Sequence, residues 1–129
     1  YAWWIYGELD TEAMQQAAAL LIGEHDFATF GSPPQGSNTV RHVLQSYWTV
    51  YPESFGHRLV YQVEANAFLY HMVRRMVGLQ VQVGQKRLTL AEFEAAFRAC
   101  NMKYARMMAP PQGLVLEKVT YPSMGEASS

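Results

Sequence analysis

Two neighbouring strand-like segments constrain the fold of this chain more than any other feature. Residues 39–51 (TVRHVLQSYWTVY) are rich in β-branched and aromatic side chains, which are enriched in strands. Residues 57–65 (HRLVYQVEA) alternate, so that Leu59, Tyr61 and Val63 share one face. The link between them, residues 52–56, has the length of a hairpin connection. The sequence therefore predicts an antiparallel pair of strands with one apolar face.

Capping residues mark the starts of two helices. Asp10 precedes a segment in which apolar residues recur at helical spacing, and Gly23 is expected to follow the last turn of that helix. Thr89 and Glu92 have the spacing of a capping box. A further helix is therefore predicted from Thr89 to about Ala99.

A long helix is predicted over residues 67–83, with Asn66 as its cap and Gly84 as its end. Its apolar stripe consists of Leu69, Met72, Val73, Met76 and Val83. Another face of the same helix carries His71, Arg74, Arg75, Gly78 and Gln82. The cations are thus gathered on one side, where Gly78 leaves room for another group to approach the helix closely.

The two arginines of this helix have two interpretations. Charged residues on a helix face are usually solvated, and periodicity alone favours this for Arg74 and Arg75. The alternative is an arginine that faces a carboxylate or a phosphate, which the planar guanidinium binds through two parallel hydrogen bonds.

The remaining segments complete the predicted organisation. Residues 24–30 are expected to form a short turn, 31–38 a turn-rich loop, 114–121 a last strand and 123–129 a flexible tail. The predicted fold class is α+β, an antiparallel sheet with helices packed on one face, in a single domain over residues 1–129.

Composition excludes several classes of protein. Cys100 is the only cysteine of the 129 residues, so an intrachain disulfide is impossible and a reducing compartment is expected. No apolar run is long enough to span a membrane. The four histidines lack metal-ligand spacing, and neither a phosphate-binding loop nor a nucleophile elbow occurs. With only two aspartates, no carboxylate pair is placed for catalysis, so the residues alone indicate no self-contained catalytic set.

Several ordered motifs resemble bacterial tRNA pseudouridine synthase A. They are LDTEAMQQAAALLIGEHDFATF, TVRHV, VEANAFLYHMVRRMVG and APPQGLVLEKVTYP, which together cover the chain from about Leu9 to Pro122. The segment ANAFLYHMVR is the most specific of them. The match is to the C-terminal half of that family, whose members isomerise uridines in the anticodon stem-loop of tRNA.

The resemblance implies roles for particular residues. The family's catalytic aspartate lies in the N-terminal half, in a Gly-Arg-Thr-Asp-like motif that this sequence lacks. Because the sequence also lacks a starting methionine, it is expected to be the C-terminal domain alone and inactive by itself. Arg74 matches the family arginine that pairs with the catalytic aspartate, and Leu114 matches a residue that lines the uracil pocket. Arg41, His71 and Arg75 are predicted RNA contacts.

The resemblance also implies partners and surroundings. The expected partners are tRNA, the protein's own N-terminal domain and a second copy in a homodimer, in the cytoplasm and without a membrane. No cofactor and no metal are expected. The sequence departs from the family pattern at Gly31, Tyr70 and Arg75, where arginine, histidine and asparagine are frequent. These departures bear on the choice of substrate.

Two alternatives remain open at this point. One is a non-catalytic RNA-binding or assembly module, in which basic residues contact phosphates without chemistry. Its cations would be Arg41, Arg74, Arg75, Lys86 and Arg87. The other is a stand-alone enzyme that uses His25 and Asp26 as an acid–base pair.

Overall fold

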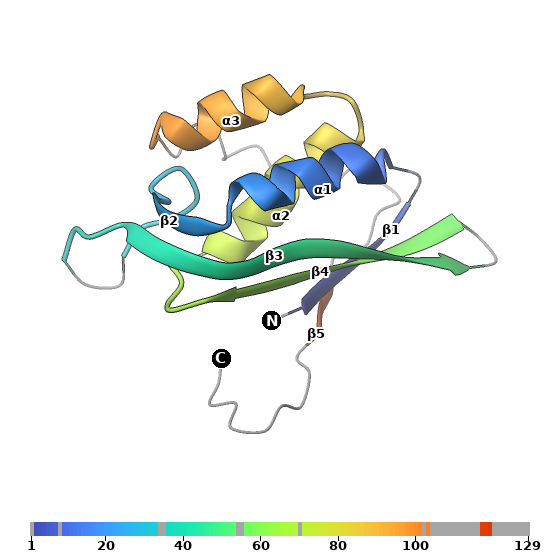
Figure 1. The fold of residues 1–129 in the computed structure, drawn as a ribbon, viewed down its shortest axis with the longest axis horizontal. Helices are drawn as coiled ribbons and strands as arrows, with labels where there is room; N and C mark the ends of the chain where they lie inside the picture. The colour runs from blue at the N-terminus through green and yellow to red at the C-terminus, as the bar shows by residue number, and fades with distance from the viewer. Residues whose placement is uncertain are drawn as a thin grey trace.

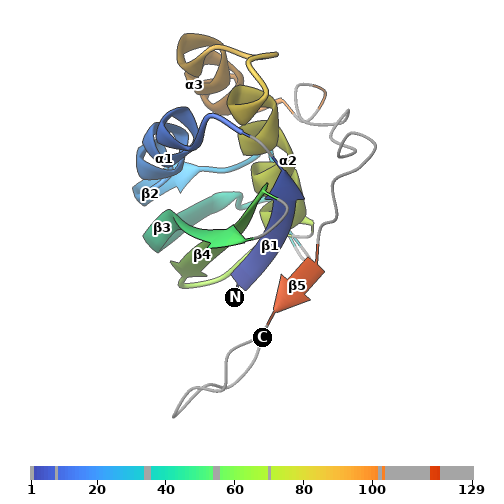
Figure 2. The same cartoon turned by 90° about the vertical axis from the view of Figure 1, so that its right-hand side faces the viewer.

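The computed structural model describes residues 2–7, 9–33, 36–53, 56–69, 71–101, 103 and 117–119. They form a five-stranded antiparallel sheet in the order β2-β3-β4-β1-β5. The three described helices lie on one face of this sheet, with α3 outermost over α1 and α2 (Figures 1 and 2). The predicted α+β architecture, with helices packed on one face of an antiparallel sheet, is confirmed. None of the described helices is both long and apolar enough to cross a membrane.

The predicted hairpin forms the middle of the sheet. Strands β3 (Val40–Glu53) and β4 (Gly56–Ala65) pair antiparallel along nearly their whole length. The alternation of β4 is confirmed, because Leu59, Tyr61 and Val63 are buried beneath the helices. Of the predicted last strand, Glu117–Val119 is described and forms β5.

Two strands were not predicted from the sequence. Strand β1 (Ala2–Gly7) lies between β4 and β5, and β2 (Gly23–Asp26) pairs with the start of β3. The prediction of a turn over residues 24–30 was therefore wrong for its first three residues. Both strands are short, and their pairing partners lie far away in the sequence, so local patterns carry little information about them.

The first and third helices start where their capping residues predict. Helix α1 (Thr11–Leu20) begins after Asp10, whose side chain accepts a hydrogen bond from a backbone N–H of the first turn. Helix α3 (Leu90–Arg98) has the complete capping box. Gly23 does not directly follow α1, because the helix is already capped at Leu21; with a φ of 110° Gly23 instead starts β2.

The long helix begins later than predicted. Helix α2 spans Met72–Gly84, and residues 67–69 are not helical. Asn66 does not cap the helix, because its side chain binds the backbone of His42 on β3. The chain needs these residues to pass from the sheet to the helix layer. Leu69 is only 3% exposed, so this connection is itself part of the core.

The core fills the space between the sheet and the helices. A group of aromatic residues in it joins the turn after β2 to helix α3, with ring centroids 5.3 to 6.5 Å apart. The members of this group are Phe27, Phe30, Phe93 and Phe97. Apolar burial of this kind is the main source of stability of the domain.

Candidate functional site

Arg74 lies in the first turn of α2, where the helix emerges from the core. Its side chain is exposed, whereas Met72 and Met76 on the opposite side of the helix are at most 1% exposed. Within the part of the chain that the structure describes, no hydrogen bond or ion pair engages the Arg74 guanidinium. No carboxylate of that part of the chain therefore neutralises this cation.

His71 sets the direction in which the chain enters this helix. Its backbone is left-handed, with φ 63° and ψ 12°, an uncommon conformation for a residue other than glycine. Such conformations cost about 1 kcal/mol or more and cluster at functional sites. The carbonyl of His71 accepts a hydrogen bond from the N–H of Arg75 at 3.1 Å. The exposed His71 side chain therefore lies at the same end of α2 as Arg74.

Arg75 differs from its neighbour. Its side chain is half-buried, and Nη1 donates to the carbonyl of Phe30 at 3.5 Å, a long hydrogen bond. The residue thus connects α2 to the turn that follows β2. Two consecutive arginines have separate environments because successive helix positions are about 100° apart.

The first turn of α2 has an unusual charge. Helices α1 and α3 carry Glu12 and Glu92 in their first turns, as the positive N-terminal end of a helix favours. Helix α2 has no acidic residue in its first turn and carries Arg74 and Arg75 there instead. Positive charge is therefore concentrated at this end of the helix.

The remainder of α2 is buried except at the half-buried Gln82. Gly78, one turn after Arg74, is buried, together with residues 76, 77 and 79–81. Gly78 was grouped with the cations in the sequence, and it lies on a covered part of the helix. The helix is therefore packed closely along its second half, while in its first turn only Arg74 is exposed.

Gln80 fastens α2 to the sheet, a role that sequence analysis missed. Its side chain is fully buried, and Oε1 accepts a hydrogen bond from the Trp48 indole Nε1 at 2.7 Å. Gln80 Nε2 donates to the carbonyl of Met76 at 3.1 Å. Burial raises the pKa of the neighbouring Tyr61 to about 12, although side-chain hydrogen bonds with Ser46 and Gln80 act to lower it. The sequence offers two glutamines in this apolar run, Gln80 and Gln82, and nothing in it distinguishes the buried one from the half-buried one.

The hydrogen bonds of the Arg41 side chain go to backbone carbonyls at and just before the start of its own strand. Nη1 donates to the carbonyls of Asn38 at 2.9 Å and Val40 at 2.8 Å. No hydrogen bond between described residues joins Arg41 to α2. The described hydrogen bonds of Arg41 thus give it no partner in common with Arg74, and its RNA contact remains a prediction. Leu114, the predicted pocket residue, lies outside the described residues.

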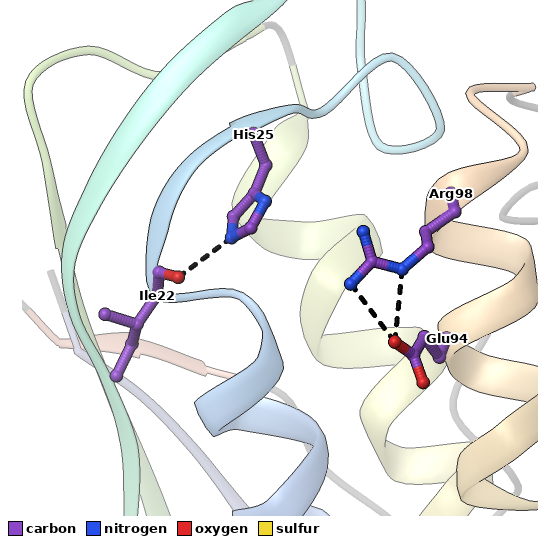
Figure 3. A network of polar contacts seen from close by, with 4 residues as sticks. All are labelled: Ile22, His25, Glu94 and Arg98. Atoms are coloured by element: carbon purple, nitrogen blue, oxygen red, sulfur yellow. Dashed lines mark hydrogen bonds and ion pairs between the residues drawn. The ribbon is translucent and has the colours of Figure 1, made fainter.

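His25 and Asp26 do not form an acid–base pair. The carbonyl of Ile22 can only accept, so the His25 Nε2–H donates to it at 2.8 Å (Figure 3). The imidazole packs edge-to-face against Phe97, with centroids 5.3 Å apart. Asp26 accepts hydrogen bonds that order the following turn, among them one from Thr39 Oγ1 at 2.6 Å. Consecutive strand residues point to opposite faces, so these two side chains have separate structural roles.

A surface arginine on α3 provides a comparison with Arg74. Arg98 binds Glu94 one turn earlier, with Nη2 and Oε2 3.1 Å apart (Figure 3). Such i,i+4 pairs are what exposed helices usually provide for a cation. Among the described residues no group of three or more His, Cys, Asp or Glu side chains could hold a metal ion. Within the described part of the chain, Arg74 therefore differs from Arg98 in having no carboxylate partner.

Comparison with known proteins identifies the family. A family model described as tRNA pseudouridine synthase matches residues 17–122. A tRNA pseudouridine synthase A of Roseiflexus castenholzii is 41% identical over 130 residues, covering 100% of this chain and 47% of the relative. The enzyme of the same name from Bordetella parapertussis is 38% identical, covering 95% of this chain and 44% of its own length. The chain belongs to the tRNA pseudouridine synthase family.

The matches cover only part of each relative. A third relative, the tRNA pseudouridine synthase A of Myxococcus xanthus, is 39% identical, covering 92% of this chain and 44% of its own length. The chain thus spans a little under half the length of the curated relatives it matches.

Proposed function

We propose that this chain is the C-terminal half of an enzyme that isomerises uridine to pseudouridine in the anticodon stem-loop of tRNA. In this proposal the catalytic aspartate belongs to the other half of the enzyme, and Arg74 supplies its ion-pair partner. The observation that supports the proposal most directly is the exposed Arg74 guanidinium, which has no carboxylate partner among the described residues.

An arginine suits this task for physical reasons. A guanidinium beside a carboxylate favours the ionised form of the acid, and its fork fixes the orientation of the two oxygens. The ionised aspartate then attacks the ribose or assists cleavage of the glycosidic bond. The effect is larger in a site from which water is excluded, because the attraction between the charges is screened less.

The reaction balances without a cofactor or a metal. The bond between the ribose and the uracil nitrogen breaks, the base turns, and a carbon–carbon bond forms in its place. The ring carbon loses its hydrogen as a proton, and the released nitrogen gains one. The target base must leave its stack to reach the site.

The remaining residues have supporting roles in this proposal. His71 and Arg75, at the start of α2, and Arg41, on β3, contact the RNA, and Leu114 lines the pocket for the uracil ring. An apolar side chain suits the flat face of a base. The intact enzyme is proposed to act as a homodimer, and the present chain alone to be inactive for want of the aspartate.

The test compares arginine variants in the intact synthase that carries this domain. The assay follows release of the labelled hydrogen from the uracil carbon, in parallel with tRNA binding. Arg74→Ala should lower turnover at least about a hundredfold and leave tRNA affinity within about threefold. Arg74→Lys should fall between Arg74→Ala and the wild type, because lysine retains the charge and loses the fork.

Arg98→Ala is the matched control. It also removes an exposed helix arginine, but one that already has its own carboxylate, so turnover should stay normal. A normal rate with Arg74→Ala would refute the proposed role. An intact polypeptide that binds tRNA and isomerises no uridine would favour the non-catalytic RNA-binding module instead.

A further inference from the structure

Asn66 makes an unusual connection at the point where the chain leaves the sheet. The β3–β4 ladder ends at the pair Val43 and Ala65. Asn66 then donates its N–H to the carbonyl of His42 at 3.0 Å, while its Oδ1 accepts the N–H of His42 at 2.9 Å. Both backbone groups of His42 are thus bound by one residue, once through its backbone and once through its side chain.

This arrangement lets the backbone leave the sheet without leaving a polar group unpaired. The Asn side chain takes the place of a backbone carbonyl, as it does in local turns. Residues after Asn66 are consequently free to turn towards the helix layer at a fixed place. A residue without a side-chain acceptor would leave the His42 N–H without this partner or let the ladder continue further.

The connection that follows is also fixed by specific contacts. The N–H of Met72 donates to the carbonyl of Leu69 at 3.1 Å, and the N–H of Leu69 donates to the Met72 sulfur at 3.4 Å. His71 adds the left-handed turn just before the helix. Asn66 is thus bonded to β3, and the buried Leu69 is bonded to the first residue of α2.

The first turn of α2 is accordingly held from two directions. Beyond it, Met76 and Gln80 are fully buried, and Gln80 is bonded to Trp48 on β3. Before it, Asn66 holds the chain against His42 on the same strand. Arg74 lies between these two attachments, so its position depends on both.

We infer that Asn66 is a positioning residue for Arg74. It fixes the start of α2 to β3 and thereby sets where the guanidinium meets the catalytic aspartate. This inference rests on the proposed function, because it gives the attachment a catalytic consequence. Misplacement of a catalytic group by about 1 Å can lower a rate roughly a hundredfold, which makes such an attachment matter for turnover.

The experiment compares two substitutions at this position in the intact synthase. Asn66→Ala removes the acceptor and should lower kcat about ten- to a hundredfold, with KM for tRNA within about threefold. Asn66→Asp keeps an oxygen that accepts the same N–H and should restore kcat to within about threefold of the wild type. Both enzymes are compared below their unfolding temperatures, which circular dichroism determines.

Asn38→Ala is the matched control. Its side-chain oxygen also accepts a backbone N–H, from Val40 at 3.1 Å, but just before β3 and not on the segment that leads from β4 to α2. It should leave kcat within about twofold of the wild type, because it loses the same kind of bond without touching the chain that leads to Arg74.

Amide hydrogen exchange separates the structural claim, that Asn66 attaches the start of α2 to β3, from the claim that this attachment matters for turnover. Asn66→Ala should speed exchange at His42 and in the first turn of α2, which shows the attachment independently of catalysis. Faster exchange with an unchanged kcat would overturn the inference and leave the role of Arg74 intact. An Asn66→Asp enzyme with a kcat as low as that of Asn66→Ala would also overturn it. If Asn66→Ala does not fold, a folded Asn66→Asp enzyme whose kcat falls ten- to a hundredfold below the wild type would overturn it as well. A normal rate for Arg74→Ala would instead remove the proposed function itself.

Discussion

Replacing Gln80 with leucine is expected to lower the free energy of unfolding by about 2 kcal/mol. Leucine resembles glutamine in size, so the main loss is polar rather than a cavity. The Trp48 indole N–H, on a side chain only 3% exposed, would lose its acceptor at 2.7 Å. An unsatisfied buried donor costs about 1–3 kcal/mol, which sets the magnitude.

A double-mutant cycle with Trp48→Phe isolates this hydrogen bond. Trp48→Phe alone removes the donor and leaves Gln80 Oε1 without it, in addition to removing packed ring atoms. In the double variant neither partner remains to be left unsatisfied. The double variant should therefore be more stable than the sum of the two single changes predicts, by about 1–2 kcal/mol.

Urea unfolding, followed by far-ultraviolet circular dichroism, measures the free energy of unfolding of the wild type, the two single variants and the double variant. This signal does not depend on the fluorescence of the altered tryptophan. Gln16→Leu is the matched control, since Gln16 is an exposed glutamine on α1. It should change stability by no more than about 0.5 kcal/mol. Additive effects of Gln80→Leu and Trp48→Phe, or a Gln80→Leu protein as stable as the control, would refute the argument that this bond holds α2 on the sheet.

Three further changes test other parts of the fold. Because burial raises the pKa of Tyr61 from 10.0 to about 12, the folded state keeps a proton that the unfolded chain loses in this interval. The free energy of unfolding should thus fall by about 1.4 kcal/mol per pH unit between these values, and urea titrations of Tyr61→Phe should show a shallower fall. Gly84→Ala would place a methyl group 2.5 Å from the sulfur of fully buried Met14 and should cost about 1–3 kcal/mol in urea unfolding; an unchanged midpoint would show that Met14 moves freely. Thr89→Ala removes one half of the capping box and should cost about 1 kcal/mol, measured in the same way, whereas no loss would mean that packing alone holds α3.

Sequence patterns predicted those elements whose sequence signal is local. The alternation of residues 57–65 and the capping box at Thr89 depend on neighbours within a few residues, and both were found where expected. Strand β2 has four residues, and it exists because Val40–Val43 of β3 offers it hydrogen bonds. Tertiary pairing of this kind overrides local preference, and the residues of β2 alone do not reveal it.

At the candidate site, too, local patterns predicted some features and tertiary contacts decided the others. Helical periodicity correctly grouped Arg74 with the polar face of α2, because that grouping depends only on the helix repeat. The start of the helix was misplaced, because Asn66 has two possible partners, a helix N-terminus or a neighbouring strand. In the structure Asn66 binds the neighbouring strand. Its N–H lies 3.0 Å from the carbonyl oxygen of His42, a proximity that only the folded arrangement creates. The separate environments of Arg74 and Arg75 likewise depend on the turn at Phe30.

The first turn of α2 contradicts a rule that the other two helices obey. Cations near the positive end of a helix are unfavourable by about 0.3–1 kcal/mol, and two consecutive arginines there compound the effect. Elsewhere this chain follows the rule, with Glu12 and Glu92 in the corresponding positions. Conflicts between a local preference and the fold are expected at functional sites, where they are offset by a ligand or partner. An anion at this end of α2 would gain from both the helix and the Arg74 guanidinium. A carboxylate from another segment of the enzyme would therefore relieve the conflict that the chain carries here, which is what the proposed pairing with the catalytic aspartate requires.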